Sequence, residues 1–416
     1  MAGPAPPDSP GRLATLDLIR GVAILGILAV NIAGFAGPAA ALLTPHLPLP
    51  ASMADEMTFA AVLLLFEGKM RTLFAILFGA SMALFIDRAD AAGRDGPALQ
   101  MRRLAWLLLF GLLHYFLLWW GDILFLYALC GILALAMRAL PTRTMALSAL
   151  LLFCGWHLSG AIETLPDIAM EERVRIGTAS PAEVDEAATF NALVRERAQV
   201  DMAETRAGMG EQIALKLRDD PFRPLLLALP NIPEVLSLLL LGMALYRSGF
   251  FAGAWPRRSL RALAGGGLLV GGGATLAALG WLWPRHFPLR AMADGLQFGL
   301  ALPHLAMALG YAALLVMAAP SLAGTRPGQR LIAAGRMAFT NYIATTVVMT
   351  AIFHGWGLRL GGTIGETGLA GFVLLGWLLM LGWSKPWLAH FRQGPLEWLW
   401  RSLTERRALP FIRRAS

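Results

Sequence analysis

The chain has 416 residues, of which 57% are hydrophobic and 15% are charged. A soluble domain carries about 25% charged residues, so this composition excludes an ordinary soluble protein and indicates an integral membrane protein. The net charge of +8 does not indicate binding to nucleic acid, because the arginines stand in short loops between apolar runs, as the positive-inside rule describes.

Hydropathy predicts about ten membrane-spanning helices, each long enough to cross a hydrocarbon layer of roughly 30 Å. The predicted fold class is therefore all-α, a polytopic transmembrane helical bundle. The predicted spans are 16–36, 69–87, 104–120, 123–139, 143–162, 224–247, 260–283, 296–318, 335–356 and 366–388. They divide the chain into a disordered cytoplasmic tail (1–15), an N-terminal five-span bundle (16–162), an extracytoplasmic loop (163–222), a C-terminal five-span bundle (223–390) and a cytoplasmic interfacial helix with a tail (391–416).

The first predicted span begins RLATLDLIRGVAILGILAVNI and carries polar residues within an apolar run. Asp17 and Arg20 share a helix face, and Asn31 returns to nearly that face about 16 Å further along. A charged residue inside a lipid segment costs at least roughly 2.5 kcal/mol, so this pair is a candidate functional site. The alternative is an arginine at a helix end that reaches the interface and pairs with a capping aspartate.

The segment after the first span contains two further candidates. His46 lies in the outer loop TPHLPLP, where most histidines have no special role. An apolar stretch, 57–66, either lies along the outer surface or re-enters the membrane. Glu67 then opens the second span and shares a helix face with Arg71, and surface anchoring does not explain Glu67 well.

The third and fourth spans form a hairpin with polar residues toward the outer side. His114 lies in the middle of the third span, and Asp122 lies where the two spans meet. A histidine bonded to a neighbouring helix and an aspartate that caps the fourth helix are the alternatives.

The outer loop 163–222 mixes acidic and basic residues, and its 183–218 portion is predicted to be a solvated helix that rests over the outer mouth. On the cytoplasmic side, Asn341 follows Arg336 at the start of the ninth span. The C-terminal GPLEWLWR is predicted to start a short interfacial helix, with Gly394 as N-cap and Pro395 in its first turn. Because arginines concentrate in the loops on one side, both termini are predicted to be cytoplasmic.

Motifs of soluble enzymes are absent from the sequence. It contains no G-x-S-x-G, no HExxH, no P-loop and no dinucleotide-binding glycine pattern. The seven histidines do not pair at metal-ligand spacing in the sequence, so no metal is predicted. Cys130 and Cys154 lie inside apolar runs, so no disulfide framework is predicted either.

Several segments resemble, in the same order and over nearly the full chain, the YeiB-like family of bacterial multi-pass membrane proteins, a domain of unknown function. They are the first span, FEGKMRTLFAILFGASMALF, RRLAWLLLFGLLHYFLLWWGDILFLYA, LLGMALYRSGFF, GRMAFTNYI and GPLEWLWR. That family is distantly similar to transmembrane acyltransferases such as heparan-α-glucosaminide N-acetyltransferase. The resemblance implies a bacterial inner-membrane protein that moves an acyl group from a cytoplasmic acyl-CoA donor to an extracytoplasmic hydroxyl or amine.

Acyl transfer requires a base, oxyanion donors and cations for the donor's phosphates. His46 stands where the resemblance implies the catalytic histidine, and His114 paired with Asp122 is the second candidate. Glu67 is a further catalytic candidate. The cationic entrance for the donor is assigned to Arg20, which pairs with Asp17, and to Arg102, Arg103 and Arg336, whereas Asn31 and Asn341 are expected to orient the acyl carbonyl.

Two other functions remain open from the sequence. A transporter or flippase-like carrier fits spans interrupted by proline with buried polar residues, although no internal repeat is visible. A non-catalytic scaffold explains the interfacial anchors alone. The expected partners are the lipid bilayer, a small-molecule or glycan acceptor and, as one option, a second copy of the chain.

Overall fold

The computed structural model describes residues 10–413, with side chains from residue 14 onward. The described part of the chain is helical apart from loops and an isolated β-bridge between Phe391 and Ile412. The helices are α1 (Pro10–Ala36), α2 (Met53–Leu65), α3 (Lys69–Ala91), α4 (Gly96–Leu117), α5 (Leu124–Ala136), α6 (Thr142–Arg175), α7 (Pro181–Arg206), α8 (Met209–Asp219), α9 (Arg223–Ala228), α10 (Ile232–Arg247), α11 (Arg257–Leu282), α12 (Leu289–Asp294), α13 (Ala301–Leu322), α14 (Arg326–Arg336), α15 (Ala338–Phe353), α16 (Glu366–His390) and α17 (Pro395–Glu405).

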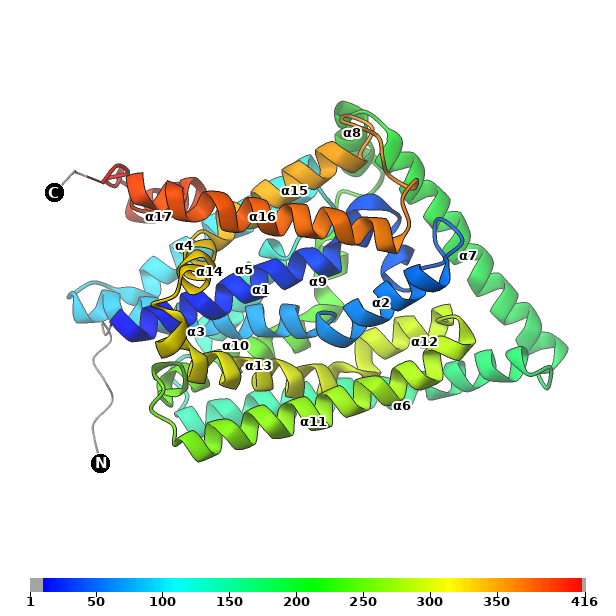
Figure 1. Ribbon diagram of the computed structural model, residues 1–416, viewed down its shortest axis with the longest axis horizontal. Helices are drawn as coiled ribbons and strands as arrows, with labels where there is room; N and C mark the ends of the chain where they lie inside the picture. The colour runs from blue at the N-terminus through cyan, green and yellow to red at the C-terminus, as the bar shows by residue number, and fades with distance from the viewer. Residues whose placement is uncertain (1–9, 414–416) are drawn as a thin grey trace.

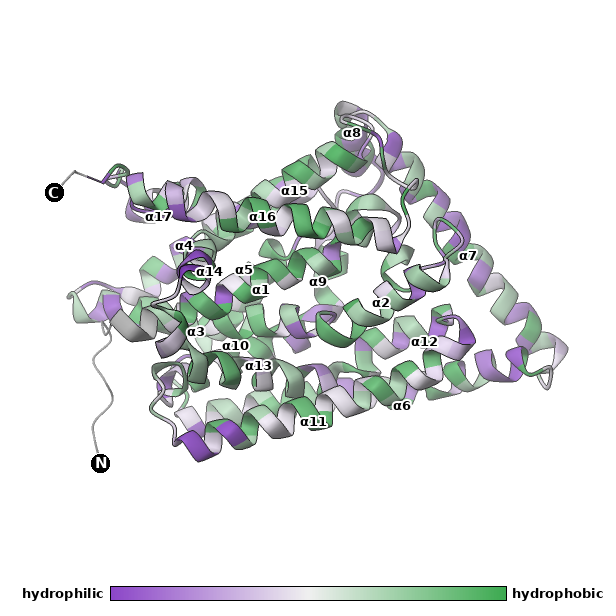
Figure 2. Cartoon of the chain, in the orientation of Figure 1, coloured by the Kyte–Doolittle hydropathy of each residue, from purple (hydrophilic) through white to green (hydrophobic). Residues whose placement is uncertain are grey.

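The predicted polytopic all-α fold is confirmed. Among the described residues, six helical segments are long and apolar enough to cross a membrane, and α5 and α15 are shorter apolar helices. The six segments are Ala14–Ala36, Thr142–Arg175, Arg223–Arg247, Arg257–Arg285, Ala301–Leu322 and Glu366–His390. The spans predicted at 69–87 and 104–120 correspond to α3 and to α4, which ends at Leu117, and neither helix is among the six. Hydrophobic residues fill the middle of the bundle, and hydrophilic residues gather at its two ends and along α7 (Figure 2).

Helices from both halves of the chain pack into one bundle around α1 and α3 (Figure 1). The most extensive helix–helix contacts include those of α11 with α13, α10 with α3, and α1 with α14. Glycines permit the tightest of these contacts. A Cβ on Gly79 would overlap the carbonyl oxygen of Leu239, and a Cβ on Gly242 would overlap that of Ile76, so α3 and α10 touch backbone to backbone.

The bundle has two polar ends, which we call the terminal face and the far face. The terminal face holds both chain ends together with α14 and α17, whereas α2, α7, α8 and α12 lie at the far face (Figure 1). The helix expected over 183–218 is two helices, because α7 ends at Arg206 and α8 begins at Met209. The apolar stretch 57–66 belongs largely to α2. Of the predicted N-terminal tail, residues 10–15 are part of α1, and residues 1–9 lie outside the described residues.

The C-terminal helix begins as predicted, with Gly394 as N-cap and Pro395 in the first turn of α17. Glu397 then points into the protein, where it accepts hydrogen bonds from the backbone amides of Phe339 (2.8 Å) and Thr340 (3.0 Å) and from the Thr340 hydroxyl. A carboxylate at a helix N-terminus is stabilised by the free amides there. Glu397 therefore fastens α17 to the start of α15.

Asp294, at the far face, has a partly buried carboxyl group whose ionisation affects the stability of the fold. Burial and the neighbouring Asp167 raise the pKa of Asp294 from 3.8 to about 6, although Arg290 opposes the shift. Its Oδ2 atom has no hydrogen-bond partner among the described residues. The folded protein therefore holds this proton more tightly than the unfolded chain, and the stability from Asp294 is present below pH 4 and is lost as the pH rises through about 6.

We accordingly expect Asp294→Asn to raise the melting temperature of the detergent-solubilised protein at pH 7.5 and to leave it unchanged at pH 4. The amide cannot ionise, so it avoids the cost of a partly buried charge. Thermal melts of both proteins at the two pH values measure this. An equal effect at both pH values would contradict it.

Candidate functional site: two cavities that meet in the bundle

Two cavities enter the bundle from opposite ends. The terminal-face cavity has a volume of about 200 Å³, and the far-face cavity has a volume of about 490 Å³. Tyr127 of α5 lines both of them, with Leu124 on one side and Leu126 on the other. Its hydroxyl donates to the carbonyl oxygen of Arg71 at 3.3 Å. One aromatic side chain therefore stands between the two cavities.

The terminal-face cavity is lined by four arginines: Arg20, Arg103, Arg336 and Arg401. Arg20 donates to Asp17 at 2.6 Å and to the Ser81 hydroxyl at 2.8 Å, so the pairing predicted within the first span is present. The one carboxylate among the lining residues, Glu397, is already bonded to the start of α15. The lining thus carries an excess of positive charge.

Arg103 is the arginine in this cavity with the most unusual surroundings. Its guanidinium lies 4.2 Å from the ring centre of Phe85 and 4.3 Å from that of Trp400, so it is held between two aromatic faces. Its buried Nε has no hydrogen-bond partner among the described residues. A guanidinium held by stacking keeps its donors available for an anion, and the planar fork suits phosphate.

Two residues predicted for the donor site lie elsewhere. Arg102, next to Arg103 on α4, points away from the cavity and donates to the carbonyl oxygen of Thr404 at 2.8 Å. Asn341 is fully buried between helices, where its amide donates to Ala334 and to Ser384 and accepts from Trp383 at 2.9 Å. These contacts give Asn341 a structural role in joining α15 to its neighbours.

The far-face cavity brings together Asn31 of the first predicted span, Glu67 just before the second, and Asp122 between the third and the fourth. The amide of Gly68 donates to Glu67 Oε1 at 3.0 Å. Asn31 also lines a small void with Tyr342 and Thr346, and Tyr342 in turn lines the terminal-face cavity. The void is otherwise lined mostly by apolar side chains, so these three polar residues lie around one small space between the two cavities.

His114 and Asp122 form a buried pair at the edge of the far-face cavity. His114 Nδ1 lies 2.9 Å from Asp122 Oδ1, and the other carboxylate oxygen accepts from the amide of Phe125 at 2.7 Å. His114 Nε2 lies 3.1 Å from the Thr346 hydroxyl. If His114 carries its proton on Nδ1, toward Asp122, Nε2 is left as the basic nitrogen, as in an Asp–His pair of a hydrolase.

His46 lines neither cavity. It lies at the far face, where its Nε2 is 3.0 Å from Glu56 Oε1. Of the catalytic candidates, Asp122 and Glu67 therefore line one cavity. His114 also lines neither cavity, but it contacts Asp122 at 2.9 Å, whereas His46 stands apart from all three.

An ion pair that the sequence did not predict joins Arg71, which lines the far-face cavity, to the buried carboxylate of Glu234. Arg71 donates to both carboxylate oxygens of Glu234, at 3.1 and 3.2 Å, and His157 lies 3.8 Å from the same carboxylate. Glu234 stands at the start of a long apolar run, and a carboxylate in such a position is a signal that could have been used. Its partner could not be inferred, because it lies 163 residues away in the chain.

Comparison with known proteins assigns the chain to a family. It is 32% identical over 410 residues to the uncharacterized protein YeiB of Escherichia coli (strain K12). The aligned region covers 97% of this chain and 99% of that protein. The chain belongs to the YeiB-like family. A family model described as "Protein of unknown function (DUF418)" matches residues 245–407.

Two further relatives are similar over almost their whole length. The uncharacterized protein YxaH of Bacillus subtilis (strain 168) is 30% identical over 400 residues, covering 94% of each chain. An uncharacterized 39.9 kDa protein in the amylase 3' region of Bacillus acidopullulyticus is 27% identical over 404 residues, covering 96% of each chain. No solved structure matches the chain. The family model matches a region of the chain that includes the terminal-face arginines Arg336 and Arg401, whereas Arg20 and Arg103 precede this region.

Proposed function

We propose that this protein is a membrane acyltransferase of the bacterial inner membrane, with about ten spans and both termini in the cytoplasm. In this proposal the terminal face is cytoplasmic, and its cavity binds an acyl-CoA-type donor. The far-face cavity binds a hydroxyl or amine acceptor, such as a sugar or another envelope component.

The observation that carries the proposal is the meeting of two unlike cavities at Tyr127. One is lined by four arginines and opens at the terminal face, and the other is lined by amide and carboxylate side chains and a single arginine, Arg71. Transfer across a membrane needs two substrates to approach from opposite sides and to meet at one point. Proximity of this kind supplies much of the rate of a two-substrate reaction.

The size of the terminal-face cavity limits how the donor enters. At about 200 Å³ it is smaller than the roughly 300–1,000 Å³ of most small-molecule sites. The narrow pantetheine arm with its thioester enters the cavity, whereas the nucleotide phosphates stay at the mouth. There they meet the arginines, whose charge suits phosphate.

The chemistry assigns a role to the His114–Asp122 pair. The acceptor oxygen or nitrogen attacks the thioester carbonyl, a new ester or amide bond forms, and the bond to sulfur breaks to release CoA. The acceptor proton reaches His114 Nε2 by way of the Thr346 hydroxyl, 3.1 Å away, which must first turn from the carbonyl oxygen of Tyr342, to which it donates at 3.2 Å. Asp122 stabilises the imidazolium that results.

A carrier is the second candidate, and one observation favours it. The helix that leads to Glu234 is broken: α9 ends at Ala228, a 3-10 turn covers Leu229–Asn231, and α10 follows. Broken helices beside a buried charge are typical of transport sites. The carrier hypothesis does not explain the four arginines that line the terminal-face cavity, because a carrier does not need to bind a CoA thioester.

The deciding experiment measures the thermal stability of the purified protein titrated with acetyl-CoA, longer acyl-CoAs and free CoA. We expect these ligands to stabilise the folded protein by roughly 2.7 kcal/mol at a hundredfold excess over the dissociation constant. No stabilisation by any of them would remove the donor assignment and favour the carrier.

Neighbouring arginines supply a matched control for this experiment. Arg103→Gln and Arg336→Gln are expected to lose the stabilisation by CoA, because both side chains line the cavity. Arg102→Gln removes the same charge one residue away but outside the cavity, so it should keep the stabilisation. Equal losses in all three variants would indicate a general effect of surface charge.

A further inference from the structure

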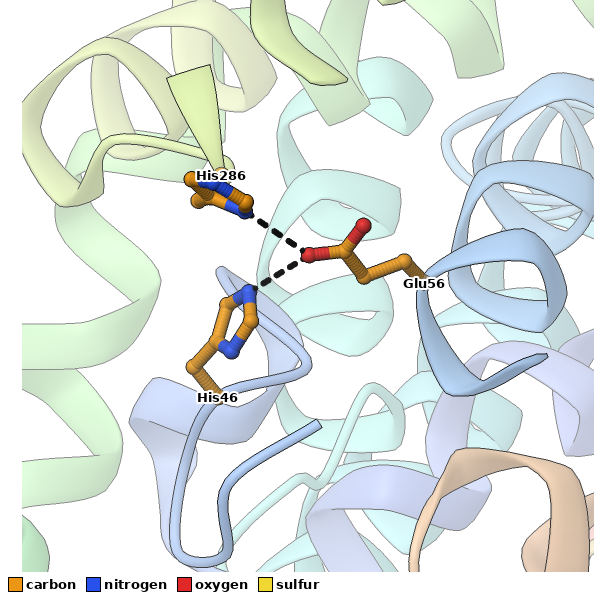
Figure 3. A group of neighbouring side chains, drawn as sticks. All are labelled: His46, Glu56 and His286. Carbon is orange, nitrogen blue, oxygen red and sulfur yellow. Dashed lines mark hydrogen bonds and ion pairs between the residues drawn. The ribbon is translucent and has the colours of Figure 1, made fainter. Parts of the chain in front are cut away.

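Three potential metal ligands, His46, Glu56 and His286, converge at the far face. Figure 3 shows their side chains directed toward one another, and none of them lines either cavity. His46 Nε2 and His286 Nδ1 each lie 3.0 Å from the same oxygen of Glu56, Oε1. The three ligand atoms all lie within 4.8 Å of one another. They come from three segments: the loop before α2, α2 itself and the turn between α11 and α12.

We propose that His46, Glu56 and His286 bind one divalent transition-metal cation of the Zn²⁺ type. Two imidazoles and one carboxylate form a common zinc ligand set. With metal–ligand bonds of about 2.0–2.2 Å, tetrahedral ligands stand roughly 3.3 Å apart, which is close to the two observed separations of 3.0 Å. The side chain of His286 is 74% exposed, so a fourth position is open to water.

The carboxylate is already oriented for this role. Trp283 donates from Nε1 to the second oxygen of Glu56 at 2.9 Å, which leaves Oε1 directed at the histidines. Outer hydrogen bonds of this kind fix the direction of a metal ligand and are part of metal sites in general. The start of α2 is fixed as well, because Ser52 and Asp55, the residue directly before Glu56, form a capping box.

The backbone at His286 is also unusual. Its φ angle is 54°, in the left-handed region that non-glycine residues seldom adopt. This conformation follows the 3-10 turn Trp283–Arg285 and directs the imidazole toward Glu56, as Figure 3 shows. A bound cation would compensate for the cost of holding this residue in a strained conformation.

The three ligands are far apart along the chain, and for this reason the sequence alone predicts no metal. His46 and Glu56 are 10 residues apart, but His286 is 230 residues from Glu56. A cation here would join the first far-face loop to the second half of the bundle. None of the three residues lines either cavity, so this proposal is independent of acyl transfer.

The test uses full-length protein without a histidine tag, treated with EDTA and titrated with Zn²⁺ by calorimetry. We expect one Zn²⁺ per chain, and roughly 100-fold weaker binding or more in Glu56→Gln and His286→Ala. His390→Ala is the matched control, because the His390 side chain is exposed and its Nδ1 contacts the carbonyl oxygen of Pro386 in the same helix. Absence of Zn²⁺ binding, or binding that is equal in all variants, would overturn the proposal and leave a hydrogen-bonded cluster only.

A second measurement does not depend on the folding of any variant. X-ray absorption of the Zn²⁺-loaded wild-type protein should show two imidazole nitrogens together with oxygen ligands. A shell with sulfur, or with oxygen alone, would place the metal elsewhere and refute the assignment.

Discussion

Replacing His114 by glutamine is expected to lower acyl transfer by about 10²–10⁴-fold, the usual contribution of a general base. Glutamine keeps a polar side chain beside Asp122 and Thr346 but cannot take up a proton. Stabilisation by acetyl-CoA should remain, because His114 does not line the donor cavity. The measurement is the release of free CoA from acetyl-CoA by protein in liposomes, with glucosamine or glucose as test acceptors.

Two other histidine variants decide what this result means. His390→Gln alters an exposed residue that lines neither cavity and should transfer at the wild-type rate. Loss of transfer in His46→Gln, with transfer retained in His114→Gln, would move the base to the far-face cluster and reject our assignment. Transfer that persists in both would exclude both histidines as the base.

Replacing Gly242 by alanine is expected to destabilise the protein by about 3 kcal/mol, the upper end of the usual range for overpacking. The added methyl group would overlap the carbonyl oxygen of Ile76 on α3. Backbone cannot rotate away as a side chain can, so α3 and α10 must separate. That separation would also disturb Arg71 and Glu234, which bridge the same two helices.

Gly273→Ala is the matched control, because no atom lies within 4 Å of the position of its Cβ. Alanine favours a helix by up to about 1 kcal/mol over glycine, so this variant should melt at the same temperature as the wild type or higher. Thermal melts in detergent compare the two variants. Equal melting temperatures for Gly242→Ala and the wild type would show that α3 and α10 are not in backbone contact.

The sequence by itself determined the class of the protein and several local features. Membrane-spanning helices can be predicted from hydropathy, because each helix makes its own backbone hydrogen bonds and therefore crosses the lipid as one continuous apolar segment. The pairing of Asp17 with Arg20 is local as well, since the residues are one turn apart. His114 and Asp122 lie only 8 residues apart, so a short hairpin already places them near each other.

Only the tertiary structure decided which side of each helix faces a cavity. Arg102 and Arg103 are adjacent in the sequence, yet Arg103 lines the terminal-face cavity and Arg102 bonds to α17, because their side chains leave α4 in different directions. Contacts such as Arg71 with Glu234 and Glu56 with His286 join residues more than 160 positions apart. Every apolar helix can present several faces to several neighbours at similar cost, and only packing of the whole bundle selects among them.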